Sequence, residues 1–73
     1  MNDFLNRIAT ILEVEQVIAT DDLKAFPQWD SLAVLSVIAM LDADFGVNLR
    51  AADLAPVKSA GELWQLVQAK KGP

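Results

Sequence analysis

The chain has 73 residues and a mass of 8.0 kDa, which predicts one small domain over residues 1–73. Apolar residues make up 53% of it, with three Gly and three Pro, unlike the composition of a disordered linker. The absence of Cys and His excludes disulfides and thiol chemistry and removes the commonest general base and metal ligand. We therefore expect neither an enzyme nor a metal site, and the net charge of −4 argues against nucleic-acid partners.

The sequence also bears on where the protein works. The first three residues carry none of the positive charge that opens an export signal, and no apolar run approaches the length of a membrane span. We therefore expect a cytoplasmic protein without a membrane span, and we expect it to be a monomer.

The first predicted element is a helix over about residues 3–14, with Asn2 or Asp3 as its cap. Apolar side chains recur along it at helical spacing, which predicts one buried face. These side chains belong to Phe4, Leu5, Ile8, Ile11 and Leu12.

The following connection, residues 15–30, is long for a compact domain. We expect it to stay ordered by packing apolar anchors across the core. The anchors are Val17, Ile18, Leu23, Phe26 and Trp29. Pro27 keeps Phe26 out of the α conformation, so no helix should run through this point.

The second predicted helix runs from Ser31 to about Phe45. Asp30 occupies the N-cap position, and Gly46 is a favourable residue just past the end of the helix. A short third element is predicted over residues 51–54, bounded by Pro56.

The last helix is predicted to open at Ser59, which forms an S-x-x-E capping box with Glu62. Lys70 and Lys71 suit the negative end of its dipole, and residues 72–73 are expected to fray. Its buried stripe consists of Leu63, Leu66 and Val67. Together the elements predict an all-α fold, a small antiparallel bundle of three main helices plus the short third one.

The second helix is unusual because both of its faces are apolar. A helical projection places Val34, Leu35, Ile38, Leu41 and Phe45 on one arc, which we interpret as the core face. The opposite arc has only two polar members and consists of Leu32, Ala33, Ser36, Val37, Met40, Ala43 and Asp44. A small domain has little mass to bury both arcs, so partner contact is favoured over additional internal burial.

Ser31 is predicted at the first position of this helix, where backbone N–H groups lack intrahelical acceptors. A phosphate ester on its hydroxyl would lie in an anion-binding environment. From the Asp30–Ser31 pair alone, a polar residue merely tolerated near a helix start is the commoner explanation.

The order and spacing of the elements around the Asp30–Ser31 pair provide further evidence about the role of Ser31. The residues that matter are Trp29-Asp30-Ser31-Leu32, the run Leu41-Asp42-Ala43-Asp44-Phe45-Gly46-Val47, and Ser59-Ala60-Gly61-Glu62-Leu63. With this spacing the chain resembles the acyl carrier protein family over nearly its whole length. The resemblance implies a four-helix bundle that carries a covalent 4′-phosphopantetheine arm, whose thiol holds acyl, aminoacyl or polyketide intermediates as thioesters.

The resemblance also assigns roles to individual residues. Ser31 would carry the arm, and Asp30 would cap the helix and help to position the metal ion of the transferase. Leu32 would be an exposed contact beside the arm. Partner docking would use Leu32, Ala33, Ser36, Val37 and Met40, while Leu35, Ile38 and Leu41 would belong to the core or line a cleft for the acyl chain.

Carriers of primary fatty acid synthesis usually have a strongly acidic second helix, whereas Ala33 and Ser36 stand here at positions expected to be exposed. This difference, with Trp29 before Asp30, favours a stand-alone carrier of a specialised pathway. Its expected partners are a phosphopantetheinyl transferase, an acyl- or aminoacyl-loading enzyme, and synthases or acyltransferases.

Two other functions remain open from the sequence. The first is a helical protein–protein interaction module that uses the apolar face of the second helix without modification. The second is a small hydrolase with Ser31 as nucleophile, which has little support because no His is present to activate it.

Overall fold

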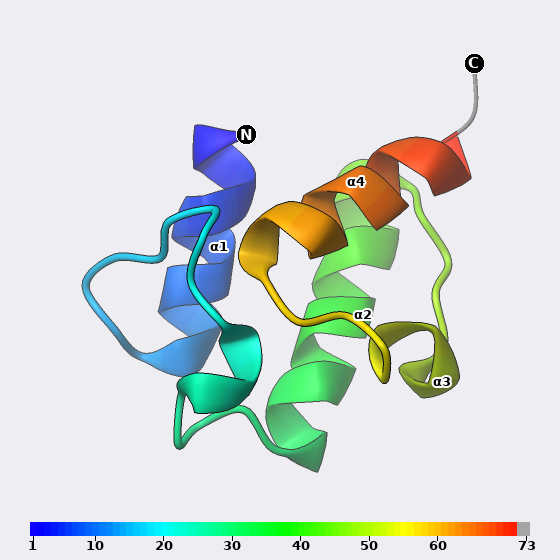
Figure 1. Cartoon of the computed structure of the whole chain (residues 1–73). Coiled ribbons are helices and arrows are strands. Elements are labelled where there is room, and N and C mark those ends of the chain that lie inside the picture. Colours follow the sequence, from blue (N-terminus) through cyan, green and yellow to red (C-terminus); the bar gives the residue numbers. More distant parts are fainter. Residues whose placement is uncertain (72–73) are drawn as a thin grey trace.

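The computed structural model describes residues 1–71, which form four helices and one short 3₁₀ turn. Figure 1 shows α1 (Asn2–Leu12) and α2 (Ser31–Phe45) running in opposite directions, with α4 (Ala60–Lys71) packed obliquely across them. The short α3 (Ala51–Leu54) lies beside the N-terminal half of α2, and no strand is formed within the described part. The predicted all-helical class, with three main helices and a short third one, is confirmed. The predicted fraying of residues 72–73 lies outside the described residues.

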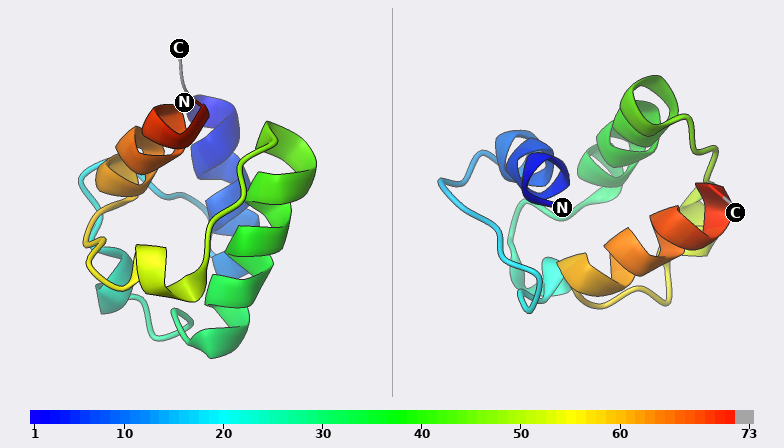
Figure 2. Two further views of the ribbon diagram at one scale, coloured as in Figure 1. Left: turned by 90° about the vertical axis from the view of Figure 1, so that its right-hand side faces the viewer. Right: turned by 90° about the horizontal axis from the view of Figure 1, so that it is seen from above.

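The core lies between α1, α2 and α4, which surround it when the protein is seen from above (Figure 2). Three aromatic rings, one from each helix, meet there. Phe4 lies 5.0 Å from Trp64 and 5.9 Å from Phe45, measured between ring centroids, and Phe45 lies 6.1 Å from Trp64. Two of the three pairs are edge-to-face, an arrangement that aromatic quadrupoles favour. The predicted apolar face of α1 is confirmed, with Ile11 half-buried and the other four residues buried.

The long connection is held mainly by backbone hydrogen bonds to the start of α4. Leu23 N–H donates to the Lys58 carbonyl (2.8 Å), and Gly61 N–H donates to the Ala19 carbonyl (2.8 Å). Only Gly fits this second contact without adjustment, because a Cβ at position 61 would lie 3.0 Å from the Ala19 oxygen. Of the predicted anchors, Val17 and Leu23 are buried.

The other three anchors differ among themselves. Phe26 and Trp29 are half-buried against the core, and Phe26 is extended as its neighbour Pro27 requires. The prediction for Ile18 is wrong: its side chain is 46% exposed. The chain turns there, and the Asp21 carboxylate accepts the Ile18 N–H, so this residue is held through its backbone.

The predicted rotation of α2 is wrong. Ala33, Val37 and Leu41 are buried, while Leu35, expected in the core, is 59% exposed. The core-facing stripe is therefore displaced around the helix by about one residue step of 100°. Both arcs of α2 are apolar, so the sequence pattern could not choose between them, and packing against α1 and α4 decides the orientation.

Arg7 joins α1 to the C-terminal end of α2. Its guanidinium lies 3.2 Å from Asp3 and 2.7 Å from Asp44, measured between the nitrogen and oxygen atoms. The hydrogen bond and charge of Asp3, followed by the charge of Asp44, raise the pKa of Arg7. The Asp3 pair lies within α1 and only the Asp44 pair connects the two helices, and both are exposed, so they add little to the stability of the fold.

Helix caps explain most of the observed bounds. The Asp30 carboxylate accepts the Ala33 N–H (2.9 Å), as an N-cap residue should, and Gly46 ends α2 with φ 65°. The Ser59 hydroxyl accepts the Glu62 N–H (3.1 Å), so half of the predicted capping box is confirmed. The other half is wrong, because the Glu62 carboxylate reaches the Lys58 N–H (2.9 Å) while Ser59 is paired with Asp22 in a short bridge.

α1 ends two residues earlier than predicted because Glu13 adopts the left-handed conformation, with φ 58°. This conformation costs a non-glycine residue about 1–2 kcal/mol, whereas Gly accepts it freely. After allowance for the greater freedom of Gly in the unfolded chain, Glu13→Gly is expected to raise the free energy of unfolding by about 0.5–1 kcal/mol. Urea unfolding followed by circular dichroism tests this, and a loss of stability would contradict it.

None of the helices within residues 1–71 combines the length and the hydropathy needed to cross a membrane.

Candidate functional site

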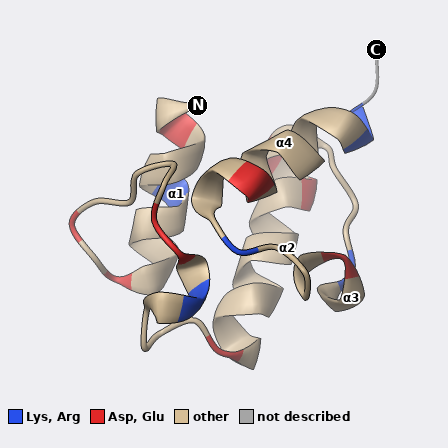
Figure 3. Ribbon diagram, viewed as in Figure 1, with Lys and Arg blue, Asp and Glu red and all other residues tan. Residues whose placement is uncertain are grey.

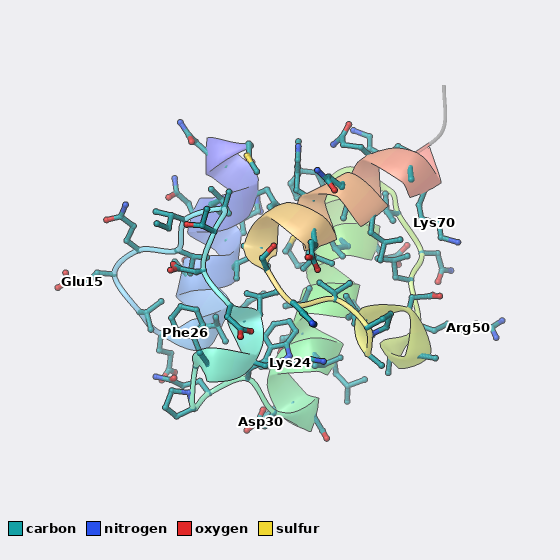
Figure 4. All side chains as sticks on the ribbon, in the orientation of Figure 1. Glu15, Lys24, Phe26, Asp30, Arg50 and Lys70 are labelled. Carbon is teal, nitrogen blue, oxygen red and sulfur yellow. The ribbon has the colours of Figure 1, made fainter. Side chains whose placement is uncertain are left out.

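The candidate site is built around Ser31, the first residue of α2. Its side chain is exposed, and no hydrogen bond among residues 1–71 engages its hydroxyl. Figure 4 shows Asp30 at the lower end of the molecule, directly before this serine. The hydroxyl can therefore be reached from solvent without any change in the core.

The electrostatic environment of Ser31 is less simple than the sequence suggests. Two of the N–H groups at this helix start already donate hydrogen bonds to Asp30. The Ala33 N–H donates to its carboxylate, and the Val34 N–H donates to its backbone carbonyl. A phosphate ester on Ser31 would gain from the helix dipole, but it would be repelled by the neighbouring Asp30 charge. We therefore expect the start of α2 to position the Ser31 side chain, and we do not expect it to bind a free anion such as phosphate.

An apolar groove of about 500 Å³ begins at Ser31 and lies between α2 and α3. One wall comes from Trp29 and the first turns of α2, the other from the short α3 and the residue after it. Asp30 and Ser31 are its polar lining residues. The apolar lining residues are Trp29, Val34, Leu35, Ala51, Leu54 and Ala55.

The α3 wall is held in place by contacts that leave the groove accessible. The Asp53 carboxylate accepts the Arg50 N–H (2.9 Å) at the start of α3. Lys24 Nζ donates to the Ala55 carbonyl (2.7 Å), which ties the end of the wall to the 3₁₀ turn, Leu23–Ala25. Leu54 is buried, whereas Ala51 and Ala55 are exposed. Small side chains at these two positions limit how far the wall fills the groove.

The predicted docking residues are only partly brought together. Leu32 is 73% exposed and Ser36 is exposed, as predicted, while Met40 is half-buried. The predicted exposure of Ala33 and Val37 is wrong: they are 7% and 0% exposed, because they lie on the core-facing stripe of α2.

Of the three residues expected in the core or along a cleft, Leu41 is buried and Ile38 is half-buried against the core. Leu35 is exposed and lines the groove, whereas Leu41 and Ile38 do not; a role of this groove in holding an acyl chain stays a prediction. The sequence did not predict the α3 side of the groove. The signals that could have indicated it were Pro56, which bounds the short helix, and the small side chains of Ala51, Ala52 and Ala55.

Charge is unevenly distributed along α2. Residues 31–41 carry no ionisable side chain, and acidic residues lie at the two ends of the helix, as Figure 3 shows. Leu32 and Leu35 are therefore exposed on an uncharged surface beside Ser31. Within residues 1–71, no three Asp or Glu side chains are arranged to hold a metal ion.

Comparison with protein-family models, with curated proteins and with solved structures found no match to this chain.

Proposed function

We propose that this protein is an acyl carrier protein that holds its cargo on a 4′-phosphopantetheine arm esterified to Ser31. The observation that carries the proposal is an exposed serine at the start of a capped helix, at the mouth of an apolar groove. The resemblance of Trp29-Asp30-Ser31-Leu32 and of the helix order to the carrier family supports it further. The protein would lack activity of its own and would act in the cytoplasm as a monomer.

Attachment of the arm requires a partner enzyme, a phosphopantetheinyl transferase. The Ser31 oxygen attacks the pantetheine-linked phosphorus of coenzyme A, forming one P–O bond as the pyrophosphate bond breaks. Adenosine 3′,5′-bisphosphate leaves, and the hydroxyl proton passes to a base on the transferase, since this chain has no His. Asp30 caps the start of α2 through the Ala33 N–H, and by the resemblance its carboxylate would also help to position the metal ion of the transferase.

Once attached, the arm supplies a thiol that carries an acyl group as a thioester. The groove beside Ser31 offers an apolar acyl group a place out of water, against Trp29, Leu35 and Leu54. The tether then raises the effective concentration of the cargo at successive partner enzymes. These partners are a loading enzyme and synthases or acyltransferases, which select the carrier by its surface.

A specialised pathway fits this carrier better than primary fatty acid synthesis. Ser36 is an exposed position without an acid, whereas Ala33, also expected to be exposed, is buried and does not contribute to the difference. The exposed surface of α2 near Ser31 is nevertheless uncharged, since it is formed by Leu32, Leu35, Ser36 and Ala39. Apolar contact should therefore contribute more to partner choice along α2 than electrostatic steering does.

An unmodified interaction module is the second candidate, favoured by the exposure of Leu32 and Leu35. Incubation with coenzyme A, Mg²⁺ and a broad-specificity phosphopantetheinyl transferase separates the two, with intact mass as the readout. The carrier proposal predicts the addition of one phosphopantetheine group. If a transferase that modifies a control carrier leaves this folded protein unchanged, the interaction module is the better account.

A further inference from the structure

Lys24 connects the 3₁₀ turn to the end of α3. Its Nζ donates a hydrogen bond of 2.7 Å to the Ala55 carbonyl, and Figure 4 shows its side chain extending from the turn toward α3. Among the described residues, this is the one hydrogen bond that joins residues 50–57 to another element. The segment is otherwise held by the buried side chains of Leu54 and Val57.

The turn that carries Lys24 is itself fixed to the start of α4. The Leu23 N–H donates to the Lys58 carbonyl (2.8 Å), and the Ala60 N–H donates to the Asp21 carbonyl (3.1 Å). These bonds join backbone to backbone, so they do not depend on any side chain. Lys24 therefore extends from a fixed support to the end of a helix of only four residues, which is too short to be stable by itself.

The carbonyl that accepts this bond belongs to a residue of the groove wall. Ala55 lines the groove that begins at Ser31, whereas Lys24 is not among the lining residues. Leu54 also lines the groove, but it is only 2% exposed and belongs to the core, so the groove borders the core at this point. Lys24 can therefore set the position of the α3 wall without any contact with a group that lies in the groove.

The groove is small for the load that the proposed function gives it. Its volume of about 500 Å³ lies in the lower part of the range of small-molecule sites, about 300–1,000 Å³. That space has to receive part of the pantetheine arm as well as the acyl group. A longer acyl chain can enter only if the α3 wall moves, and movement of its end strains or breaks the Lys24 bond, because the turn that carries Lys24 is fixed.

We propose that Lys24 is a positioning residue that holds the α3 wall in place and so limits this carrier to short acyl groups. Lys24 acts through the Ala55 carbonyl and has no contact with the cargo. The bond needs a donor at the end of a long side chain, which Arg supplies and Met lacks. This inference rests on the proposed function, because it concerns the group that the arm on Ser31 carries.

Amide hydrogen exchange of the unmodified protein tests whether Lys24 holds the wall. The Val57 N–H donates to the Leu54 carbonyl (3.1 Å) at the end of α3, so its exchange reports opening of the wall. In Lys24→Met this amide is expected to exchange about threefold faster, as the loss of one exposed charged hydrogen bond implies, and in Lys24→Arg at the wild-type rate. The Leu23 amide, which donates to the Lys58 carbonyl, should be unchanged in both variants. Equal exchange of Val57 in the wild type and in Lys24→Met would overturn the proposal.

A second experiment measures the length of the acyl group that the groove shelters. The broad-specificity transferase loads acetyl-, hexanoyl- or decanoyl-pantetheine from the corresponding acyl-coenzyme A, and the rate of thioester cleavage by hydroxylamine is measured. In the wild-type protein, the hexanoyl thioester is expected to be cleaved more slowly than the acetyl thioester, with no further protection of the decanoyl thioester. In Lys24→Met, the decanoyl thioester is expected to be cleaved about threefold more slowly than in the wild type, because the wall can move to admit the longer chain.

Lys58→Met is the matched control. It removes the same charge from an exposed lysine whose side chain forms no hydrogen bond among the described residues. Its dependence on acyl length should match that of the wild type, and so should that of Lys24→Arg. A general loss of stability would speed cleavage at every length, so it cannot produce the expected shift. An unchanged length dependence in Lys24→Met, or the same shift in Lys58→Met, would contradict the role assigned to Lys24.

These results are separable from a failure of the proposed function. If the wild-type protein is never modified by a transferase that modifies a control carrier, the carrier proposal is wrong, and the limit on acyl length fails with it. If the protein is modified and Lys24→Met behaves like Lys58→Met, only the role of Lys24 is wrong. Thermal unfolding of each variant verifies that it is folded at the assay temperature.

Discussion

Replacing Val37 by Asp is expected to unfold the protein, whereas the same replacement at Leu35 is expected to leave it folded. Val37 is 0% exposed, so Val37→Asp buries a carboxylate without a partner, at a cost of more than about 4 kcal/mol. A domain of this size has about 4–11 kcal/mol of total stability. Leu35 is 59% exposed, and a change there should alter the free energy of unfolding by less than about 0.5 kcal/mol.

Circular dichroism and urea unfolding measure this difference directly. The two variants introduce the same side chain into the same helix, two residues apart, so each serves as the control for the other. If Leu35→Asp unfolds the protein and Val37→Asp does not, α2 has the rotation first expected from its sequence, and the position assigned to the groove is wrong.

Replacing Phe4 by Ala is expected to remove about 3–5 kcal/mol from the free energy of unfolding. Phe4 is 0% exposed and contacts both other rings of the aromatic cluster, so its loss leaves a cavity between α1, α2 and α4. Trp64 should then emit at longer wavelength as water reaches it, which can be observed in a Trp29→Phe background. Phe26→Ala is the control: Phe26 is only half-buried and lies outside the cluster, so it should cost less. Equal losses from both variants would contradict the central position of Phe4.

The helix bounds at Asp30 and Gly46 could be predicted because caps depend on short-range chemistry. A carboxylate that accepts an N–H three residues later, and a Gly that adopts a positive φ, require no knowledge of the rest of the fold. The end of α1 could not be predicted in this way, since Glu13 takes a conformation that its side chain disfavours.

The rotation of α2 and the groove depend on tertiary contacts instead. With apolar residues on both arcs of α2, periodicity alone cannot assign the core face, and Val37 and Leu35 exchange roles as a result. The groove forms only if α3 lies beside Ser31. A hydrogen bond from Lys24 to the Ala55 backbone carbonyl helps to hold the end of α3 there. Backbone acceptors leave no pattern in a sequence.

The most direct test of the central claim is to map the modified residue by peptide mass spectrometry after incubation with coenzyme A, Mg²⁺ and the transferase. The chain has three serines, at positions 31, 36 and 59, and Ser36 is also exposed, so it serves as an internal control on the same helix. The account predicts one phosphopantetheine group on the peptide that contains Ser31, attached at that residue, complete loss of modification in Ser31→Ala, and full modification in Ser36→Ala. Modification at Ser36 or Ser59, or its persistence in Ser31→Ala, would contradict the account.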